Sequence, residues 1–364
     1  MKRKVRFRHF DKLLFFTPIL IFLIGILSIY SASYKVHQSL DDTMAARQFL
    51  WMGVAVLVVF LIVRWDYFKL ADLAWPFYFL SLVFLVAVLF MSPRLGARRW
   101  IELGGFNFQP SEMAKLSIIL VLAHFFSSHR PEYISKDCLL IPFLVVGVPF
   151  LLILKEPDLG TGLILIPVFL AMLYVWGYDP KKLLIIMGAG LVLSPVFFMF
   201  LKEYQRSRLL VFINPNLDPL GAGYTIIQSK IAIGSGGFWG KGFLSGTQNQ
   251  LKFLPERHTD FIFGVIGEEG GFLASALVIL LFWLMIRRGF QICGQTPDKF
   301  GSQLACGITT MLGLQAMINL GMTMGLLPVV GVPLPLVSYG GTSVVLTMLA
   351  IGLLINIKMH RSLF

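Results

Sequence analysis

One aspartate, Asp260, stands where a long polar segment ends and an apolar helix is expected to begin. The surrounding residues 254–271 read LPERHTDFIFGVIGEEGG. A carboxylate at a helix start is favoured by the helix dipole, so Asp260 could be an ordinary N-terminal helix residue, with Thr259 as a nearby cap. At the edge of a membrane helix, however, an ionisable group is a candidate functional group. There, Asp260 could act as a general base.

Glu112 and Lys115 form a second candidate pair, within the segment QPSEMAK. They are three residues apart, so they share one face of a helix and could form an ion pair. One interpretation is a salt bridge that stabilises the helix end. The other is that Lys115 contacts a phosphate or sugar while Glu112 orients it.

Two pairs of arginines could bind phosphate groups. Arg98 and Arg99 lie in the segment GARRW, and paired guanidinium groups can fork onto phosphate oxygens. A solvated basic loop is the commoner role for such a pair. Arg206 and Arg208 open a long polar segment, either as phosphate contacts or as side chains that reach lipid headgroups.

Two further polar residues are expected on the same side of the membrane as Asp260. Asp158, in KEPDLGTG, is either a helix N-cap or a second carboxylate. With Asp260 it could help to bind a divalent cation, Mg²⁺ or Mn²⁺, beside pyrophosphate. Ser338, a candidate substrate contact, lies in PLPLVSYGGTS, where prolines and paired glycines bend the chain. Glu268 and Glu269 follow Asp260 by about two helical turns and need polar partners, for which Asn319 is a candidate.

The composition indicates what positions these residues. Of 364 residues, 57% are hydrophobic and 14% charged, and the mean hydropathy is +0.78. Soluble domains carry roughly 25% charged residues. Apolar windows of about 20 residues, long enough to span a bilayer, recur throughout the chain. We therefore predict one all-α polytopic domain over residues 1–364, with ten membrane helices at 13–33, 46–64, 71–92, 111–128, 138–155, 159–178, 182–201, 260–287, 303–326 and 333–357.

The charges predict the orientation of this domain. The net charge of +12 resides mostly in short loops, so it follows the positive-inside rule and does not indicate nucleic-acid binding. Both termini are then cytoplasmic, in a multi-pass protein of the cytoplasmic membrane. The long segment 202–259, between the seventh and eighth helices, is extracytoplasmic. Within it, Tyr224–Ile233 predicts a short interfacial helix.

Several of these segments resemble the shape, elongation, division and sporulation (SEDS) family, and its RodA branch most. They are GARRWIELGGFNFQPSEMAK, EPDLGT, GAGYTIIQSKIAIGSGGFWGKG, LPERHTDFIFGVIGEEGG and QAMINLGMTMGLLPVVGVPLPLVSYGGTS. The resemblance implies a peptidoglycan glycosyltransferase that joins lipid II units into β-1,4 glycan strands at the outer membrane face during cell elongation. The family's essential aspartate falls on Asp260, and its glutamate and lysine of the fourth helix fall on Glu112 and Lys115.

The resemblance also implies partners. These are lipid II, the lipid-linked glycan strand, membrane lipids, a class B penicillin-binding protein that crosslinks the strand, and other elongation proteins. An organic cofactor is not expected. Two alternatives stay open at this point: a lipid II flippase, which would use polar residues through the depth of the bilayer, and a scaffold for a partner synthase, in which Asp260 would be dispensable.

Overall fold

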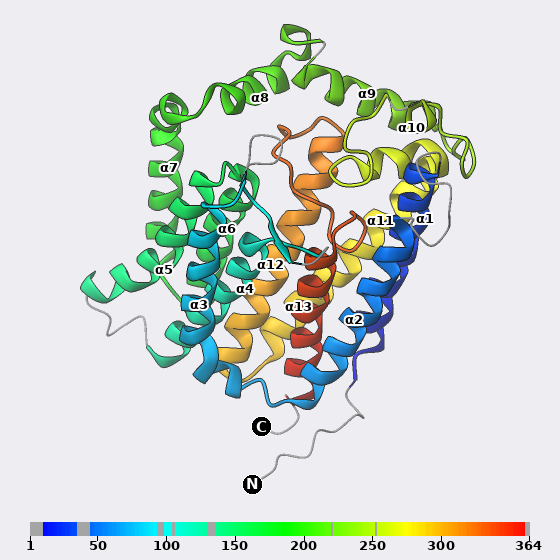
Figure 1. Cartoon of the computed structure of the whole chain (residues 1–364). Coiled ribbons are helices and arrows are strands. Elements are labelled where there is room, and N and C mark those ends of the chain that lie inside the picture. The colour runs from blue at the N-terminus through cyan, green and yellow to red at the C-terminus, as the bar shows by residue number, and fades with distance from the viewer. Residues whose placement is uncertain are drawn as a thin grey trace.

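The computed structural model describes residues 10–34, 44–92, 98–103, 106–129, 136–219, 221–251 and 253–360. Each of the ten predicted helical segments coincides with a helix in these ranges. The helices are α1 (Lys12–Ser33), α2 (Met44–Arg64), α3 (Lys69–Val88), α4 (Pro110–Ser128), α5 (Lys136–Lys155), α6 (Leu159–Trp176), α7 (Pro180–Phe200), α11 (Ile262–Gln295), α12 (Lys299–Thr323) and α13 (Gly341–His360). They pack as a bundle with both chain termini at one end (Figure 1).

Eight of these helices are long and apolar enough to cross a membrane, within the ranges described: α1–α4, α6 and α11–α13. The burial pattern fits a bundle in lipid. Helix α4 is almost wholly buried at the centre, whereas outward-facing side chains such as Leu50 on α2 and Leu191 on α7 are more than two-thirds exposed. Large exposed apolar side chains on long helices indicate a lipid-facing surface. The chain is thus a multi-pass membrane protein.

The segment between α7 and α11 forms an arch over the end of the bundle opposite the termini (Figure 1). It contains α8 (Glu203–Ile213), α9 (Ala222–Ser235) and the short α10 (Thr247–Gln250). The predicted helix at 224–233 corresponds to α9, whereas α8 and α10 were not predicted. The described part of the chain is mostly helical, as predicted, but it also contains an unpredicted antiparallel hairpin of β1 (Ile101–Leu103) and β2 (Phe106–Phe108).

Helix α11 is broken at Gly271, where φ is 63° and ψ is −158°. The break leaves unpaired backbone groups, and a glycine-rich loop after α9 satisfies them. The Phe272 amide donates to the Gly237 carbonyl at 2.9 Å, and the Lys241 amide donates to the Glu268 carbonyl at 3.0 Å. A β-carbon at Gly271 would lie 2.3 Å from a backbone nitrogen of this loop, so only glycine fits. The predicted single helix over 260–287 is therefore two segments.

The last helix begins at residue 341 and not at 333, because Pro333 and Pro335 keep the preceding segment out of a helix. This segment is fastened to α2 by Gln48, a fully buried side chain. Its Nε2 donates to the Ser338 carbonyl at 3.0 Å, and its Oε1 accepts from the Gly340 amide at 3.1 Å. The segment thereby lies inside the bundle, close to the turn before α11.

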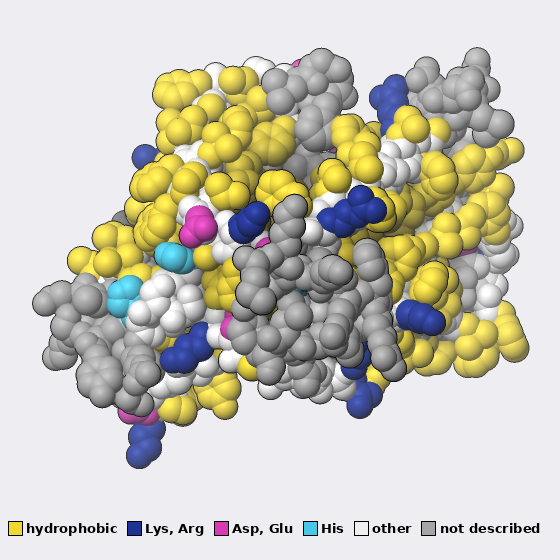
Figure 2. Space-filling view, turned by 90° about the horizontal axis from the view of Figure 1, so that it is seen from below, with side chains coloured by type: hydrophobic (Ala, Val, Ile, Leu, Met, Phe, Trp, Pro, Cys, Tyr) yellow, Lys and Arg dark blue, Asp and Glu magenta, His cyan; other side chains and the backbone are white. Residues whose placement is uncertain are grey.

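The face that carries the termini is seen in Figure 2. Lys and Arg side chains are scattered there among apolar ones. A basic face of this kind would lie outside the hydrocarbon core of a membrane.

Candidate functional site

Asp260 lies in a turn that precedes α11. The amides of Thr259 and Phe261 both donate to the Glu256 carbonyl, at 3.1 and 3.2 Å. Phe261 is buried, so it fixes the turn against the bundle while Asp260 stays half-buried. Asp260 thus lies just before the positive end of a helix, as the sequence predicted, and within reach of the charge of Arg208 on α8.

Burial raises the pKa of Asp260 from its ordinary 3.8 to about 6. The negative charge of Glu256 raises this pKa further, and the guanidinium groups of Arg99 and Arg208 partly offset the rise. A carboxylate with a pKa near 6 is ionised at neutral pH and is a stronger base than an ordinary aspartate. These are the properties of a general base.

Gly331 shows how close Asp260 and Arg99 are. A β-carbon added there would lie 3.3 Å from Oδ2 of Asp260 and 3.9 Å from Nη1 of Arg99. Gly331 has a φ of 72°, a conformation that favours glycine, so the backbone next to Asp260 and Arg99 carries no side chain at this position. A carboxylate and a guanidinium group therefore border the same small space.

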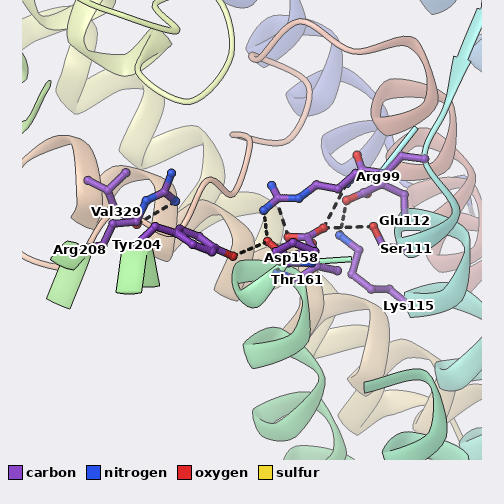
Figure 3. Close-up of polar contacts among 11 residues, drawn as sticks. Arg99, Ser111, Glu112, Lys115, Asp158, Thr161, Tyr204, Arg208 and Val329 are labelled. Carbon is purple, nitrogen blue, oxygen red and sulfur yellow. Dashed lines mark hydrogen bonds and ion pairs between the residues drawn. The ribbon is translucent and has the colours of Figure 1, made fainter. Parts of the chain in front are cut away.

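Arg99 is held at the start of α6 (Figure 3). Its Nη1 lies 3.9 Å from Oδ1 of Asp158, and its Nη2 donates to the Pro157 carbonyl. The same carbonyl accepts from the hydroxyl of Tyr204, on α8, at 3.4 Å. These contacts connect the arch to the bundle through the loop between α5 and α6.

Asp158 is almost fully buried and has several partners. It caps α6, where Oδ1 accepts from the Thr161 amide at 3.4 Å. Its Oδ2 accepts from Gln109 Nε2 and from Ser111 Oγ, each at 3.3 Å. The N-cap interpretation is therefore correct, and the same carboxylate also joins the beginnings of α4 and α6 to Arg99.

Glu112 and Lys115 form a buried ion pair with 2.6 Å between Oε1 and Nζ. The Lys115 side chain is 1% exposed and the Glu112 side chain 5% exposed. The pair lies beside Ser111 and Asp158 (Figure 3). In this conformation the ammonium group is occupied by Glu112 and closed to solvent, so its contact with a phosphate or sugar stays a prediction.

The remaining arginines separate into two groups. Arg208 faces the site: its Nη1 donates to the Val329 carbonyl at 3.4 Å, and its charge acts on Asp260. Arg98 instead donates to the Leu89 carbonyl at 2.6 Å. Arg206 donates to carbonyls at the end of α7. Neither joins the group around Asp260 in this structure, and their predicted phosphate contacts are untested.

Ser338 is buried and holds the backbone of the site. Its Oγ donates to the Thr259 carbonyl at 2.6 Å and accepts from the Leu334 amide at 2.8 Å. Next to it, the Tyr339 amide donates to the His258 carbonyl at 2.9 Å. Ser338 therefore supports the turn of Asp260, and its predicted contact with substrate is untested.

Glu268 and Glu269 lie at the break in α11 and not deep within a continuous helix. Glu268 pairs with Lys241 at 2.7 Å, and Glu269 accepts from Ser31, near the end of α1, at 2.5 Å. Asn319, the partner expected from the sequence, contacts neither. The two carboxylates are part of the polar network that fastens the glycine-rich loop.

Sequence reasoning did not recognise three contributors to the site: Tyr204, Gly331 and the buried Glu156. Both Glu156 oxygens lack hydrogen bonds from any described residue. Burial, and then the neighbouring charge of Asp158, raise the pKa of Glu156 to about 9, so it is neutral at pH 7. No sequence pattern marked this group, because its neutral state depends on three-dimensional packing. Arg208 and Val329 also border a cavity of about 90 Å³, which is lined as well by Val211, Thr225 and Ile226.

Residues 11–363 match the family model for FtsW, RodA and SpoVE cell cycle proteins. The chain is 42% identical over 292 residues to the peptidoglycan glycosyltransferase MrdB of Escherichia coli (strain K12), covering 79% of this chain and 78% of that protein. It is 38% identical over 359 residues to the stage V sporulation protein E of Bacillus subtilis (strain 168), covering 96% and 97%.

Two solved structures are also similar. One comes from a study of structural coordination of polymerization and crosslinking by a peptidoglycan synthase complex; the chains are 34% identical, with a TM-score of 0.82 over 97% of this chain and 98% of that one. The other is the rod shape determining protein RodA of Thermus thermophilus, 28% identical, with a TM-score of 0.71 over 97% of each chain.

Proposed function

The chain belongs to the FtsW, RodA and SpoVE family, and from this premise we propose that it is a peptidoglycan glycosyltransferase that polymerises lipid II into β-1,4 glycan strands during cell elongation. The observation that carries the proposal is the common space bordered by Asp260 and Arg99 at one end of a membrane bundle. A base and a cation that flank one space can deprotonate a hydroxyl while they stabilise an anionic leaving group.

The reaction is a single inverting displacement. The 4-hydroxyl of the acceptor sugar attacks the anomeric carbon of the donor, and Asp260 takes the hydroxyl proton. The new C–O bond forms as the bond between the anomeric carbon and the lipid pyrophosphate breaks, which converts an α-linked donor into a β-linked product. The departing pyrophosphate gains negative charge, which Arg99 and Arg208 stabilise. Guanidinium groups suit phosphate oxygens because they donate bidentate hydrogen bonds.

A divalent cation is a separate proposal, with Asp260 and Asp158 as the candidate ligands. The geometry fits it poorly, because the guanidinium of Arg99 already occupies the space beside both carboxylates. Among the described residues, no three His, Cys, Asp or Glu side chains form a group suited to a metal ion. We therefore derive no step from a metal.

We place the site on the outer face of the cytoplasmic membrane, with both termini and the basic face of Figure 2 in the cytoplasm. In this arrangement α5 and α7 also span the membrane. The substrate is an anionic sugar lipid whose tail stays in the bilayer. By analogy with the synthase complex that resembles this chain, a class B penicillin-binding protein would crosslink the product.

The flippase and scaffold alternatives are less well supported. Transport would use polar groups through the depth of the bundle, but Glu268 and Glu269 are closed off by Lys241, Ser31 and the glycine-rich loop. A scaffold would not require the raised pKa of Asp260. Neither alternative accounts for a base and a cation that border one space.

The test is lipid II polymerisation by the purified protein, alone and fused to a cognate penicillin-binding protein that carries no other polymerase. Glycan ladders from wild type would support the proposal, and their loss on addition of EDTA would support a metal. The absence of ladders from a folded complex would contradict it. Translocation of lipid II in liposomes by that same sample would then identify a flippase.

The pH dependence follows from the pKa of Asp260. Because this pKa is about 6 and the base must be ionised, kcat/KM is expected to be flat above about pH 7. Below about pH 6 it should fall about tenfold for each pH unit. Initial rates between pH 4.5 and 8, with folding checked at each pH, measure this limb. A profile that stays flat down to pH 4.5 would rule out Asp260 as a base of this pKa.

A further inference from the structure

Within the described part of the chain, the carboxylate of Asp260 is positioned by its backbone and not by hydrogen bonds of its own. No hydrogen bond from another described residue reaches its two oxygens. The base therefore depends on whatever holds the turn from Glu256 to Phe261. Two side chains from outside the turn donate to its carbonyls: Ser338 to Thr259, and Asn319 to Asp260 itself.

Asn319 lies on α12 and is fully buried. Its Nδ2 donates to the Asp260 carbonyl at 2.9 Å and to the Val332 carbonyl at 2.7 Å, which uses both of its N–H groups. Its Oδ1 has no partner among the described residues. The amide cannot be reversed, because Oδ1 would then face two carbonyl oxygens. Among the described residues, the hydrogen bonds of the Asn319 side chain are therefore the two that it donates.

These two bonds join opposite sides of the space that Asp260 and Arg99 border. One side is the turn of Asp260. The other is the segment in which Val332 follows Gly331, the residue that faces both Oδ2 of Asp260 and Nη1 of Arg99. A single amide nitrogen thus sets the distance between Asp260 and the backbone at Gly331, which also borders the guanidinium of Arg99.

We propose that Asn319 is a positioning residue for glycosyl transfer, which holds Asp260 at its reactive distance by tying the Asp260 and Val332 carbonyls together. The inference rests on the proposed function. Misplacement of a catalytic group by about 1 Å can reduce a rate about 100-fold even when substrate still binds. Loss of Asn319 should therefore reduce kcat and leave KM nearly unchanged.

The chain contains a matched control. Asn356, on α13 near the end that carries the termini, is also fully buried and also has an unpartnered Oδ1. Its Nδ2 donates to two backbone carbonyls of the α2 end, those of Ile62 and Trp65, the latter at 2.7 Å. It has the same chemistry and burial as Asn319 but lies at the opposite end of the bundle from Asp260.

The experiment compares Asn319→Leu with Asn356→Leu in the full-length protein fused to its partner. Leucine has a similar size and removes both donors. We expect similar losses of Tm in the two variants. The kcat of Asn319→Leu should fall about 10–100-fold with KM within about twofold of wild type, whereas Asn356→Leu should keep its kcat. Asn319→Gln, which keeps the amide on a longer side chain, should recover part of the lost rate.

Two outcomes would overturn the inference: a folded Asn319→Leu with wild-type kcat, or an equal loss of kcat in Asn356→Leu. If Asn319→Leu does not fold, Asn319→Ser is measured under the same criteria, because its hydroxyl retains one donor. Failure of the proposed function gives a different result from failure of this inference. In that case wild type would make no glycan, or Asp260→Asn would stay active. An inactive Asp260→Asn beside a fully active Asn319→Leu counts against this inference alone.

Discussion

Asp260→Asn is expected to reduce lipid II polymerisation by about 10²–10⁴-fold, the usual contribution of a general base. Asparagine has nearly the same shape but cannot accept the proton of the attacking hydroxyl. The backbone contacts of the turn, including the bond from Asn319, do not involve the carboxylate and should persist. Glycan ladders from the variant and wild type, at equal protein concentration and in the same fusion, measure the effect.

A loss of activity caused by unfolding can be distinguished from loss of the base by measuring Tm, because the pKa of Asp260 predicts how the substitution changes stability. Folding raises the pKa of Asp260 from 3.8 to about 6, so the folded state disfavours the ionised form. The corresponding contribution to stability is present below about pH 4 and is lost as pH rises through about 6. At neutral pH Asp260→Asn should therefore melt at or above the wild-type Tm. A matched control is Glu203→Gln, an exposed acid in the arch, which should keep full activity.

A variant that is folded and still polymerises at the wild-type rate would refute the role of Asp260. A variant that is inactive and also melts well below wild type would show that the carboxylate supports the fold, contrary to the sign argued above.

Lys115→Met is expected to lower the free energy of unfolding by about 3–5 kcal/mol. The substitution leaves Glu112 as a buried carboxylate without its counter-ion. The double variant Glu112→Gln/Lys115→Met removes both charges at once. It should recover most of that loss, because a neutral pair of similar volume has no uncompensated charge.

The free energy of unfolding in detergent, measured for the wild type, the two single variants and the double variant, gives the coupling energy of the pair. Equal stability of Lys115→Met and the double variant would contradict the prediction. Activity of the double variant addresses the second role of Lys115. Polymerisation at the wild-type rate would confine the pair to structure, whereas an inactive but stable protein would support contact with the substrate.

The bundle could be predicted from the sequence because lipid imposes a simple rule. About 20 apolar residues in a row indicate a helix in any membrane protein, so the positions of α1–α7 and α11–α13 followed from hydropathy. The break at Gly271 did not follow. A Gly-Gly pair inside an apolar run is compatible with a continuous helix, and only the approach of the 236–242 loop makes the positive φ necessary.

The candidate residues could be chosen from the sequence one by one, but their arrangement could not be predicted. Asp158 could be placed at a helix start because capping is local, and Asp260 because an apolar run begins directly after it. Arg98 and Arg99 could not be told apart, since adjacent residues in a loop point in directions that sequence does not specify. Ser338 and Asn319 were identified as polar residues, but their bonds to the turn of Asp260 join residues more than fifty positions apart. Contacts of that range depend on how the helices pack.

The break in α11 also uncouples two motions. The nine residues from Ile262 to Gly270 form about 13 Å of helix that is not coaxial with the spanning segment after Gly271. If the spanning segment tilts or rotates in the bilayer, that motion need not be transmitted to Asp260, whose turn is bonded to α12 and to the segment before α13. A change in the thickness of the surrounding lipid, or a partner protein that binds α11, would change the angle between the two segments at Gly271. The carboxylate of Asp260 would keep its position relative to Arg99 while the spanning segment of α11 moves.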